Sequence, residues 1–219
     1  MVFDGTPRQV VSHRRARLLV VRVTSYNRRM SSGLAAGFLL DQQWHWMRGE
    51  METTKKPALA ALVRVLDSAH VPYAIIGGVA VQVHHPDPRT TLDIDVAVLS
   101  ADAIPRDALT AAGFKSTGSF QHSENWEAEN GTPVLFTDDP GLASAVRSAE
   151  EVPLENVTLR VIRVVDLVRQ KIRAGSDPAR RRSKRLSDLV DAQGLLEAYP
   201  NLRAELAPEE LAVLDRLPF

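Results

Sequence analysis

Hydrophobic residues follow a helical spacing first and an extended spacing next, beginning near residue 54. Apolar positions recur at i, i+3, i+4 and i+7 from Leu59 to Leu66, which predicts an amphipathic helix. Thr53 or Thr54 is suited to cap this helix, and it should end before Pro72. The apolar run Tyr73–Ile76 then predicts a short buried strand that stops at a pair of glycines.

The rest of the chain continues to alternate between helices and strands. We predict, in order, a helix over Val79–His85, a strand over Thr91–Leu99, a helix over Ile104–Ala112, strands over Ser119–Glu127 and Thr132–Thr137, a short helix over Gly141–Ala149, a strand over Val157–Val164, and helices over Asp166–Ala174, Ser183–Tyr199 and Pro208–Leu217. Asn130-Gly131 predicts a tight hairpin turn between the strands over Ser119–Glu127 and Thr132–Thr137. This order indicates an α/β (α+β) fold, with a small mixed β-sheet, helices on one side of it, and C-terminal helices.

The pattern divides the chain into three parts. Residues 1–52 form a poorly patterned basic extension, 53–165 an α/β core, and 166–219 a helical region packed on the core. The first fifty residues hold eight arginines and three acidic residues, a balance of about +5. A later methionine, Met51, precedes the first patterned helix, so the extension is interpreted either as an upstream addition from an early start codon or as a disordered or weakly helical arm. No chemistry is assigned to it, including its aromatic cluster at Trp44 and Trp46.

Composition excludes several classes of site. The chain has no cysteine, which excludes disulfides and cysteine-ligated zinc or iron–sulfur centres. No apolar stretch approaches the roughly 20 residues that span a bilayer. The balance of 27 basic and 27 acidic residues is ordinary for a globular protein. We therefore expect a soluble cytoplasmic protein with no membrane partner.

Two aspartates mark the strand over Thr91–Leu99. Side chains in a strand alternate between its faces, so Asp93 and Asp95 point to the same side while the apolar residues between and around them face the core. Carboxylates this close repel one another unless they are solvated or a cation joins them. Mg²⁺ or Mn²⁺ is such a cation, and a carboxylate pair is a common anchor for metal-assisted phosphoryl chemistry. By itself, the pair is more often a solvated strand edge.

The glycine pair Gly77-Gly78 supplies a complementary feature. A strand that ends in glycines and opens a helix presents backbone N–H groups to an anion, and the missing side chains allow a phosphate to approach. Such a pair is often only a tight turn. Its combination with Arg89-Thr90-Thr91 and the aspartate strand is far more specific for a nucleotide site.

The stretch from Tyr73-Ala-Ile-Ile-Gly-Gly-Val-Ala-Val to Arg89-Thr-Thr-Leu-Asp-Ile-Asp-Val resembles the core motif of the nucleotidyltransferase superfamily, to which DNA polymerase beta belongs. More narrowly, it resembles bacterial nucleotidyltransferase-like proteins related to the AbiEii/AbiGii toxins. The resemblance covers about residues 57–197 and includes the later segments Val165-Asp-Leu-Val-Arg-Gln-Lys171 and Ser183-Lys-Arg-Leu-Ser-Asp188. It implies that Gly77 and Gly78 hold nucleotide phosphates, Asp93 and Asp95 bind Mg²⁺, Lys171 approaches the nucleotide, and Asp188 is the acid of the last motif.

Three positions depart from the family pattern. The superfamily usually brings a third carboxylate from a later strand, where this chain has Leu135. Asp138 or Asp139, just beyond that strand, is the candidate substitute. Leu92 stands where a basic residue is common, and Arg185 where the last motif usually begins with an acid. A site without its third carboxylate is expected to bind Mg-nucleotide but to transfer poorly.

These features favour an Mg²⁺-dependent nucleotidyltransferase that moves a nucleoside monophosphate from an NTP to a hydroxyl group, with Arg89 or Lys171 neutralising the developing charge. The resemblance implies RNA (tRNA) or a protein as acceptor and a toxin–antitoxin or phage-defence setting with a cognate antitoxin. One alternative is a catalytically impaired protein of the same fold that binds nucleotide, RNA or a protein partner; another is a purely structural module. The basic run Arg180–Arg185 suits nucleic-acid phosphates, or equally a solvated helix start.

Overall fold

The computed structural model describes residues 32–48 and 54–216. Within this part of the chain, a seven-stranded sheet has the order β3-β4-β5-β2-β1-β7-β6. Its strands are β1 (Tyr73–Ile76), β2 (Ile94–Val98), β3 (Lys115–Phe120), β4 (Ser123–Glu127), β5 (Pro133–Thr137), β6 (Glu150–Leu154) and β7 (Val157–Val161). β1 runs parallel to β7 and β2 parallel to β5, while the other neighbours are antiparallel. The predicted mixed α/β architecture is confirmed.

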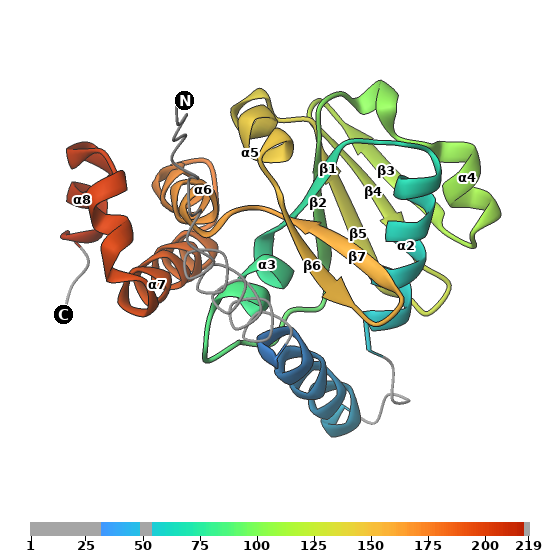
Figure 1. The fold of residues 1–219 in the computed structure, drawn as a ribbon, viewed down its shortest axis with the longest axis horizontal. Coiled ribbons are helices and arrows are strands. Elements are labelled where there is room, and N and C mark those ends of the chain that lie inside the picture. The colour runs from blue at the N-terminus through green and yellow to red at the C-terminus, as the bar shows by residue number, and fades with distance from the viewer. Residues whose placement is uncertain (1–31, 49–53, 217–219) are drawn as a thin grey trace, which may run out of the picture.

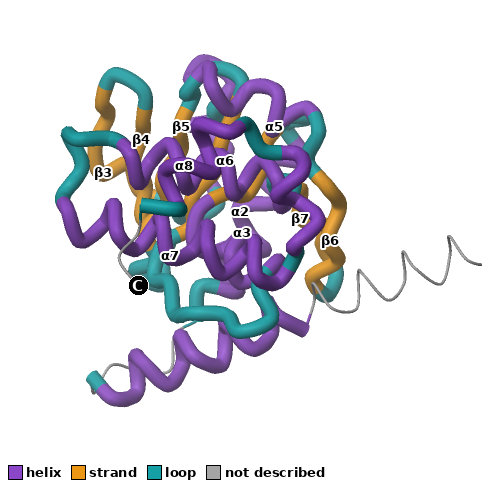
Figure 2. The backbone as a smooth tube through the Cα atoms, turned by 90° about the vertical axis from the view of Figure 1, so that its left-hand side faces the viewer, coloured by secondary structure: helices purple, strands orange, loops and turns teal. Residues whose placement is uncertain are grey.

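The helices are α2 (Lys56–Ser68), α3 (Gly77–His84), α4 (Arg106–Ala111), α5 (Ala143–Arg147), α6 (Val164–Ser176), α7 (Arg182–Ala198) and α8 (Pro208–Leu214), with short 3-10 turns at Ala101–Ala103, Pro140–Leu142 and Pro200–Glu205. α2 and α4 lie on one side of the sheet, to its right in Figure 1. The opposite face of the sheet is also covered in part, because α5 contacts β1 and β2 there. The C-terminal helices α6, α7 and α8 stand in front of the strands in Figure 2.

Side chains along β2 point alternately to the hydrophobic core and to the opposite face, where the two aspartates lie. Ile94, Val96 and Val98 are buried in the core, together with their neighbours Val134 and Phe136 on β5. Asp95, between two of these residues, faces the opposite side. The apolar stripe of α2 is buried as predicted, and the Thr54 hydroxyl accepts a hydrogen bond from the backbone N–H of Lys56 at its start. Thr53 lies outside the described residues.

Two strands were not predicted as such. The single strand expected over Ser119–Glu127 is two strands, β3 and β4, joined by a turn. The sequence did not predict β6, because its two glutamates and Pro153 are poor strand formers. In the structure, Val152 and Leu154 of this strand are buried against the sheet. Pro153 is tolerated because β6 is an edge strand.

Residues 32–47 form a helix (blue in Figure 1), where the sequence predicted a poorly patterned extension, either an upstream addition or a disordered or weakly helical arm. Leu34 and Phe38 are buried in the core, so this part of the extension is packed. The helix lies close to α3, since a Cβ placed on Gly37 would be 2.4 Å from the side chain of Gln82. Residues 1–31 and 49–53 lie outside the described part, and the division into three domains stays a prediction.

The helices of the described residues are all too short or too polar to cross a membrane.

His84 ends α3 in the core with 2% of its surface exposed. Its Nε2 donates to the carbonyl oxygen of Ile162 over 2.7 Å, and in the described structure its buried Nδ1 has no hydrogen-bond partner. Burial lowers the pKa of His84 to about 4, against the hydrogen bond, which raises it. His84 is therefore neutral in the folded protein at pH values where it is charged in the unfolded chain.

We expect this histidine to make folding sensitive to acid. The unfolded chain takes up a proton as the pH falls below about 6.5, and the folded chain does so only near 4, so stability present above pH 6.5 is lost between these values. The loss attributable to His84 should be about 2–3 kcal/mol by pH 4.5. Urea unfolding at pH 7.5 and pH 4.5 measures it. His84→Gln, which keeps a donor for Ile162, should show a smaller loss, whereas exposed His122→Gln should match the wild type; equal losses in all three would contradict the argument.

Candidate active site

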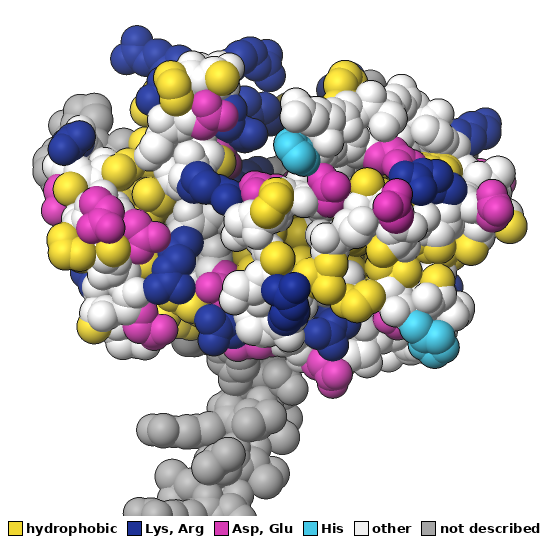
Figure 3. Space-filling view, turned by 90° about the horizontal axis from the view of Figure 1, so that it is seen from above, with side chains coloured by type: hydrophobic (Ala, Val, Ile, Leu, Met, Phe, Trp, Pro, Cys, Tyr) yellow, Lys and Arg dark blue, Asp and Glu magenta, His cyan; other side chains and the backbone are white. Residues whose placement is uncertain are grey.

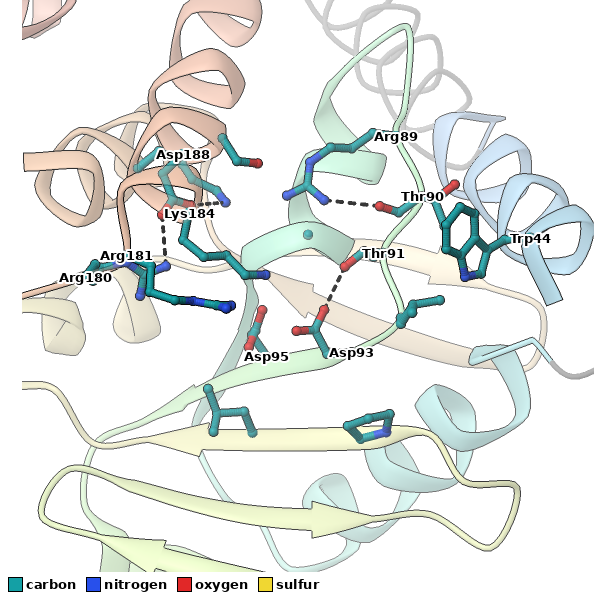
Figure 4. A pocket seen from close by; sticks show the side chains of 16 residues that line it. Trp44, Arg89, Thr90, Thr91, Asp93, Asp95, Arg180, Arg181, Lys184 and Asp188 are labelled. Carbon is teal, nitrogen blue, oxygen red and sulfur yellow. Dashed lines mark hydrogen bonds and ion pairs between the residues drawn. The ribbon is translucent and has the colours of Figure 1, made fainter. Parts of the chain in front are cut away.

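A cleft of about 890 Å³ opens between the sheet and the C-terminal helices. It is lined by the helix over residues 32–47 (the N-terminal helix), the Arg89–Asp95 segment, β5, α6 and the start of α7. Lys and Arg side chains gather around a hollow between the C-terminal helices and the sheet (Figure 3). Figure 4 shows the two aspartates at the centre of the cleft, with basic side chains facing them from α7 and the loop before it.

Asp93 and Asp95 are brought together as predicted, on the same side of the β2 segment. The Thr91 hydroxyl donates to Oδ1 of Asp93 over 2.7 Å, and the backbone N–H of Gly78 donates to the Asp95 carboxylate. Burial, and then the neighbouring charge of Asp93, raise the pKa of Asp95 to about 7, against the attraction of Lys171. Two ionised carboxylates are therefore costly here without a cation between them.

The glycine pair lies directly against these acids. Gly77 has a φ of +63°, and a Cβ at this position would be 1.9 Å from Oδ2 of Asp95. A Cβ on Gly78 would be 2.2 Å from Oγ1 of Thr91. Both glycines belong to the first turn of α3, rather than preceding it as the sequence predicted. The turn must be made of glycine because the carboxylate and its threonine occupy the space that side chains would need.

Lys171 is held between two carboxylates of α7. Its Nζ lies 2.9 Å from Asp188 and 2.9 Å from Asp191, and it is only 5% exposed. Arg89 binds both oxygens of Asp191 at 2.8 Å, and Arg180 binds Asp188 at 2.9 Å. The chain of charges Arg180–Asp188–Lys171–Asp191–Arg89 thus fixes one wall of the cleft. Asp191 was not among the predicted site residues; its spacing of three from Asp188 on a helix is the signal that places both on one face.

The N-terminal helix holds the segment that carries Arg89 and Thr91. Asp41 accepts hydrogen bonds from the backbone N–H of Thr91, at 3.1 Å, and from Gln82, at 3.4 Å. It also forms a buried ion pair with Lys55, which donates to the carbonyl oxygen of Thr91 over 3.0 Å. Burial lowers the pKa of Lys55, and Asp41 opposes that shift. Both backbone groups of Thr91 are therefore bound by a buried acid and base, and Thr91 in turn binds Asp93.

The position expected for a third carboxylate is apolar. Leu135 pairs with Asp95 across the parallel β2–β5 ladder and lines the same cleft. Asp138 instead lies 3.2 Å from His122 and does not line the cleft with the two aspartates. Asp139 accepts from the backbone N–H of Gly141 and pairs with Arg173 beside a neighbouring cavity of about 470 Å³. Within the described residues, no three His, Asp or Glu side chains are grouped as metal ligands.

The donor set still fits a hard divalent cation. Asp93 and Asp95 offer carboxylate oxygens, the ligands that Mg²⁺ and Mn²⁺ prefer, and Mg²⁺ commonly binds through one or two carboxylates with water and phosphate completing its shell. A cation would also remove the repulsion that raises the pKa of Asp95. The two aspartates are thus suited to hold a metal together with a phosphate ligand, rather than in a cage made only of protein atoms.

No family model and no curated protein matches the chain. Solved structures that it resembles include an antigenic nucleotidyltransferase-like protein from Paracoccidioides brasiliensis (20% identity, TM-score 0.45, 73% of this chain and 91% of that one). They also include the antibiotic-resistance factor ANT(2'')-Ia (17%, 0.48, 75% and 97%) and the Megavirus polyadenylate synthase (12%, 0.44, 91% and 40%). At these identities and TM-scores, function has to be inferred from the residues of the cleft.

Proposed function

We propose that the protein is a nucleotidyltransferase that transfers a nucleoside monophosphate from an NTP to a hydroxyl group with Mg²⁺ or Mn²⁺. The observation that carries this proposal is the contact between the Gly77-Gly78 turn and the Asp93/Asp95 pair, at the centre of a cleft lined by basic side chains. The Gly78 N–H holds the Asp95 carboxylate, so a metal bound at the two aspartates would lie beside this turn and face the basic side chains of the cleft. The cleft volume of about 890 Å³ suits a nucleotide.

The charges of the cleft fit a triphosphate. Lys184 lowers the pKa of Asp95 from across the cleft, and Arg180 and Arg181 line the same side. These cations balance phosphate charge that the two aspartates would otherwise repel. Lys171 is committed to Asp188 and Asp191, so we assign it and Arg89 to positioning the wall of the site first, and to phosphate contact only through their remaining donors.

The transfer forms a bond between the acceptor oxygen and the α-phosphorus and breaks the bond to the β-phosphate oxygen, releasing pyrophosphate. A bound Mg²⁺ would supply Lewis acidity at the phosphate. Asp93 and Asp95 would hold that ion, the Gly78 N–H fixes the Asp95 carboxylate, and the basic side chains would stabilise the charge that leaves with pyrophosphate. Leu135 stands beside Asp95, where a third carboxylate would take the proton from the acceptor hydroxyl. Without that carboxylate, the proton goes to water.

The second candidate is a catalytically impaired protein that binds Mg-nucleotide, RNA or a protein partner. Leu135 is the specific observation in its favour, because it faces Asp95 where a third carboxylate would stand. The resemblance to AbiEii/AbiGii toxins adds the finer proposals: an RNA or protein acceptor, a cognate antitoxin and a cytoplasmic site of action.

The direct test incubates the full chain with each α-³²P-labelled NTP, Mg²⁺ or Mn²⁺, and bacterial RNA, total protein or a small polyhydroxylated acceptor. Label that joins an acceptor and is lost with EDTA supports the transferase. Metal-dependent NTP binding without transfer supports the impaired protein. A chain that neither transfers label nor binds any NTP would overturn the transferase and the binding of Mg-nucleotide by an impaired protein.

Restoring the third acid tests the assignment of Leu135. Leu135→Asp is expected to tighten Mn²⁺ binding by about tenfold, because a third carboxylate would face Asp95 across the β2–β5 ladder. Electron paramagnetic resonance of free Mn²⁺ measures the affinity. Leu135→Asn, of equal size but without charge, is the matched control and should bind Mn²⁺ as the wild type does. Equal affinity in the Asp and Asn variants would place the metal site elsewhere.

A further inference from the structure

The cleft has two chemically different ends. Trp44, Leu92 and Pro133 line one end, and the cationic side chains of Arg180, Arg181 and Lys184 line the other. Figure 4 shows Trp44 on one side of the two aspartates and the basic side chains on the opposite side. A nucleoside triphosphate has the same polarity, with a flat apolar base at one end and its charge at the other.

From this match we infer that Trp44 is the docking surface for the nucleobase, which makes the helix over residues 32–47 part of the active site. The inference rests on the proposed function and adds a binding determinant for the donor nucleotide. With phosphates at the basic end and the α-phosphate at the aspartates, the base is directed toward Trp44 and Leu92, which are 40% and 41% exposed. Exposed large apolar side chains inside a polar cleft are costly unless a ligand covers them.

The position of Trp44 is fixed by its helix. Trp44 follows Asp41 by three residues, so both side chains lie on the same face, and Asp41 is anchored to Lys55 and Thr91. Phe38, one turn earlier, is buried in the core. Trp46 lies on another face of the helix, is 71% exposed and does not line the cleft. The chain therefore has one tryptophan set at the cleft and a close neighbour that serves as an internal control.

Stacking sets the expected selectivity. An aromatic ring binds the face of any base, and alanine substitution of such a ring weakens binding by about 5- to 100-fold. Leu92 and Pro133 add apolar contact at this end, and stacking on Trp44 is the contact that all four bases share. We therefore expect affinities for the four NTPs that differ little and that all depend on Trp44, with purines somewhat favoured by their larger rings.

The test measures binding of Mg-ATP, Mg-CTP and Mg-tripolyphosphate to the full chain by equilibrium dialysis, without an acceptor. Trp44→Ala should weaken both nucleotides by about 5- to 100-fold and leave tripolyphosphate unchanged, and Trp44→Phe should restore most of the affinity. Trp46→Ala should bind all three ligands as the wild type does. Thermal unfolding confirms that each variant is folded.

Two results would overturn the inference while leaving the proposed function intact. One is unchanged NTP affinity in Trp44→Ala, which would remove the base from this end of the cleft. The other is an equal loss for tripolyphosphate, which would show that Trp44 acts on the phosphates or on the fold. If the wild type bound neither nucleotide nor tripolyphosphate, the proposed function itself would fail.

Discussion

A variant in which asparagine replaces both Asp93 and Asp95 is expected to lose nucleotide transfer by at least about 10³-fold and to remain folded. Asparagine keeps the size of each side chain and removes both charges, so a divalent ion loses its protein anchor. A bound metal contributes several kcal/mol to charge stabilisation in the transition state, and about 4 kcal/mol corresponds to 10³ in rate. The transfer of labelled nucleotide at saturating Mg²⁺ measures the effect.

The same variant should be at least as stable as the wild type when metal is absent. Asp95 is buried beside Asp93, and its raised pKa means that folding opposes ionisation of this carboxyl at neutral pH. The free energy of unfolding therefore falls as the pH rises toward the folded-state pKa of about 7, and the destabilisation of the wild type is largest above that pH. Asparagine cannot ionise, so the variant lacks this destabilisation. Urea unfolding at pH 8 with EDTA tests this.

Asp107→Asn, on exposed α4, is the control for the transfer assay. Equal transfer activity in the double variant and the wild type would eliminate the proposed metal site.

The buried ion pair of the N-terminal helix gives the second large effect. Asp41→Asn is expected to reduce the free energy of unfolding by about 3–5 kcal/mol, because it leaves the Lys55 charge buried without its partner. It also weakens the acceptor for the Thr91 N–H, and so loosens the segment that places Asp93. We therefore expect slower transfer in the fraction of the variant that is folded.

An adjacent surface pair provides the matched control. Lys56 pairs with Glu155 at 2.5 Å, with both side chains exposed, so Lys56→Met should change stability by less than about 1 kcal/mol. Urea unfolding of the two variants at pH 7.5 compares them. A chain that starts at Met51 should resemble Asp41→Asn or be less stable still, because it lacks the whole helix. If Asp41→Asn and Lys56→Met were equally mild, the helix would not anchor the site.

Much of the site was predictable from local sequence. The alternation of apolar and polar residues around Asp93 and Asp95 determined that both carboxylates face one way, because side chains alternate along any strand. Gly77-Gly78 marked a turn that admits close approach. These conclusions need only backbone geometry and the order of elements along the chain.

The local sequence could not show which chemical group lies against the two glycines. The sequence indicated a phosphate at Gly77, and the fold places the Asp95 carboxylate there. Likewise, Asp138 is close in sequence to Leu135, the position expected for the third acid, but it is directed to His122 because β5 ends before it. A spacing of a few residues does not determine distance once a strand has ended.

The sequence by itself thus determined the helices and strands with clear periodicity and the face of β2 that bears the acids, since each follows from residues near one another in the chain. Only the tertiary structure decided that residues 32–47 are a helix of the site, that Asp41 binds Thr91 fifty residues later, and that Asp191 completes the network around Lys171. Those contacts join segments whose own patterns are weak or neutral. They become favourable only when folding removes water from the charges and brings their partners within hydrogen-bonding distance.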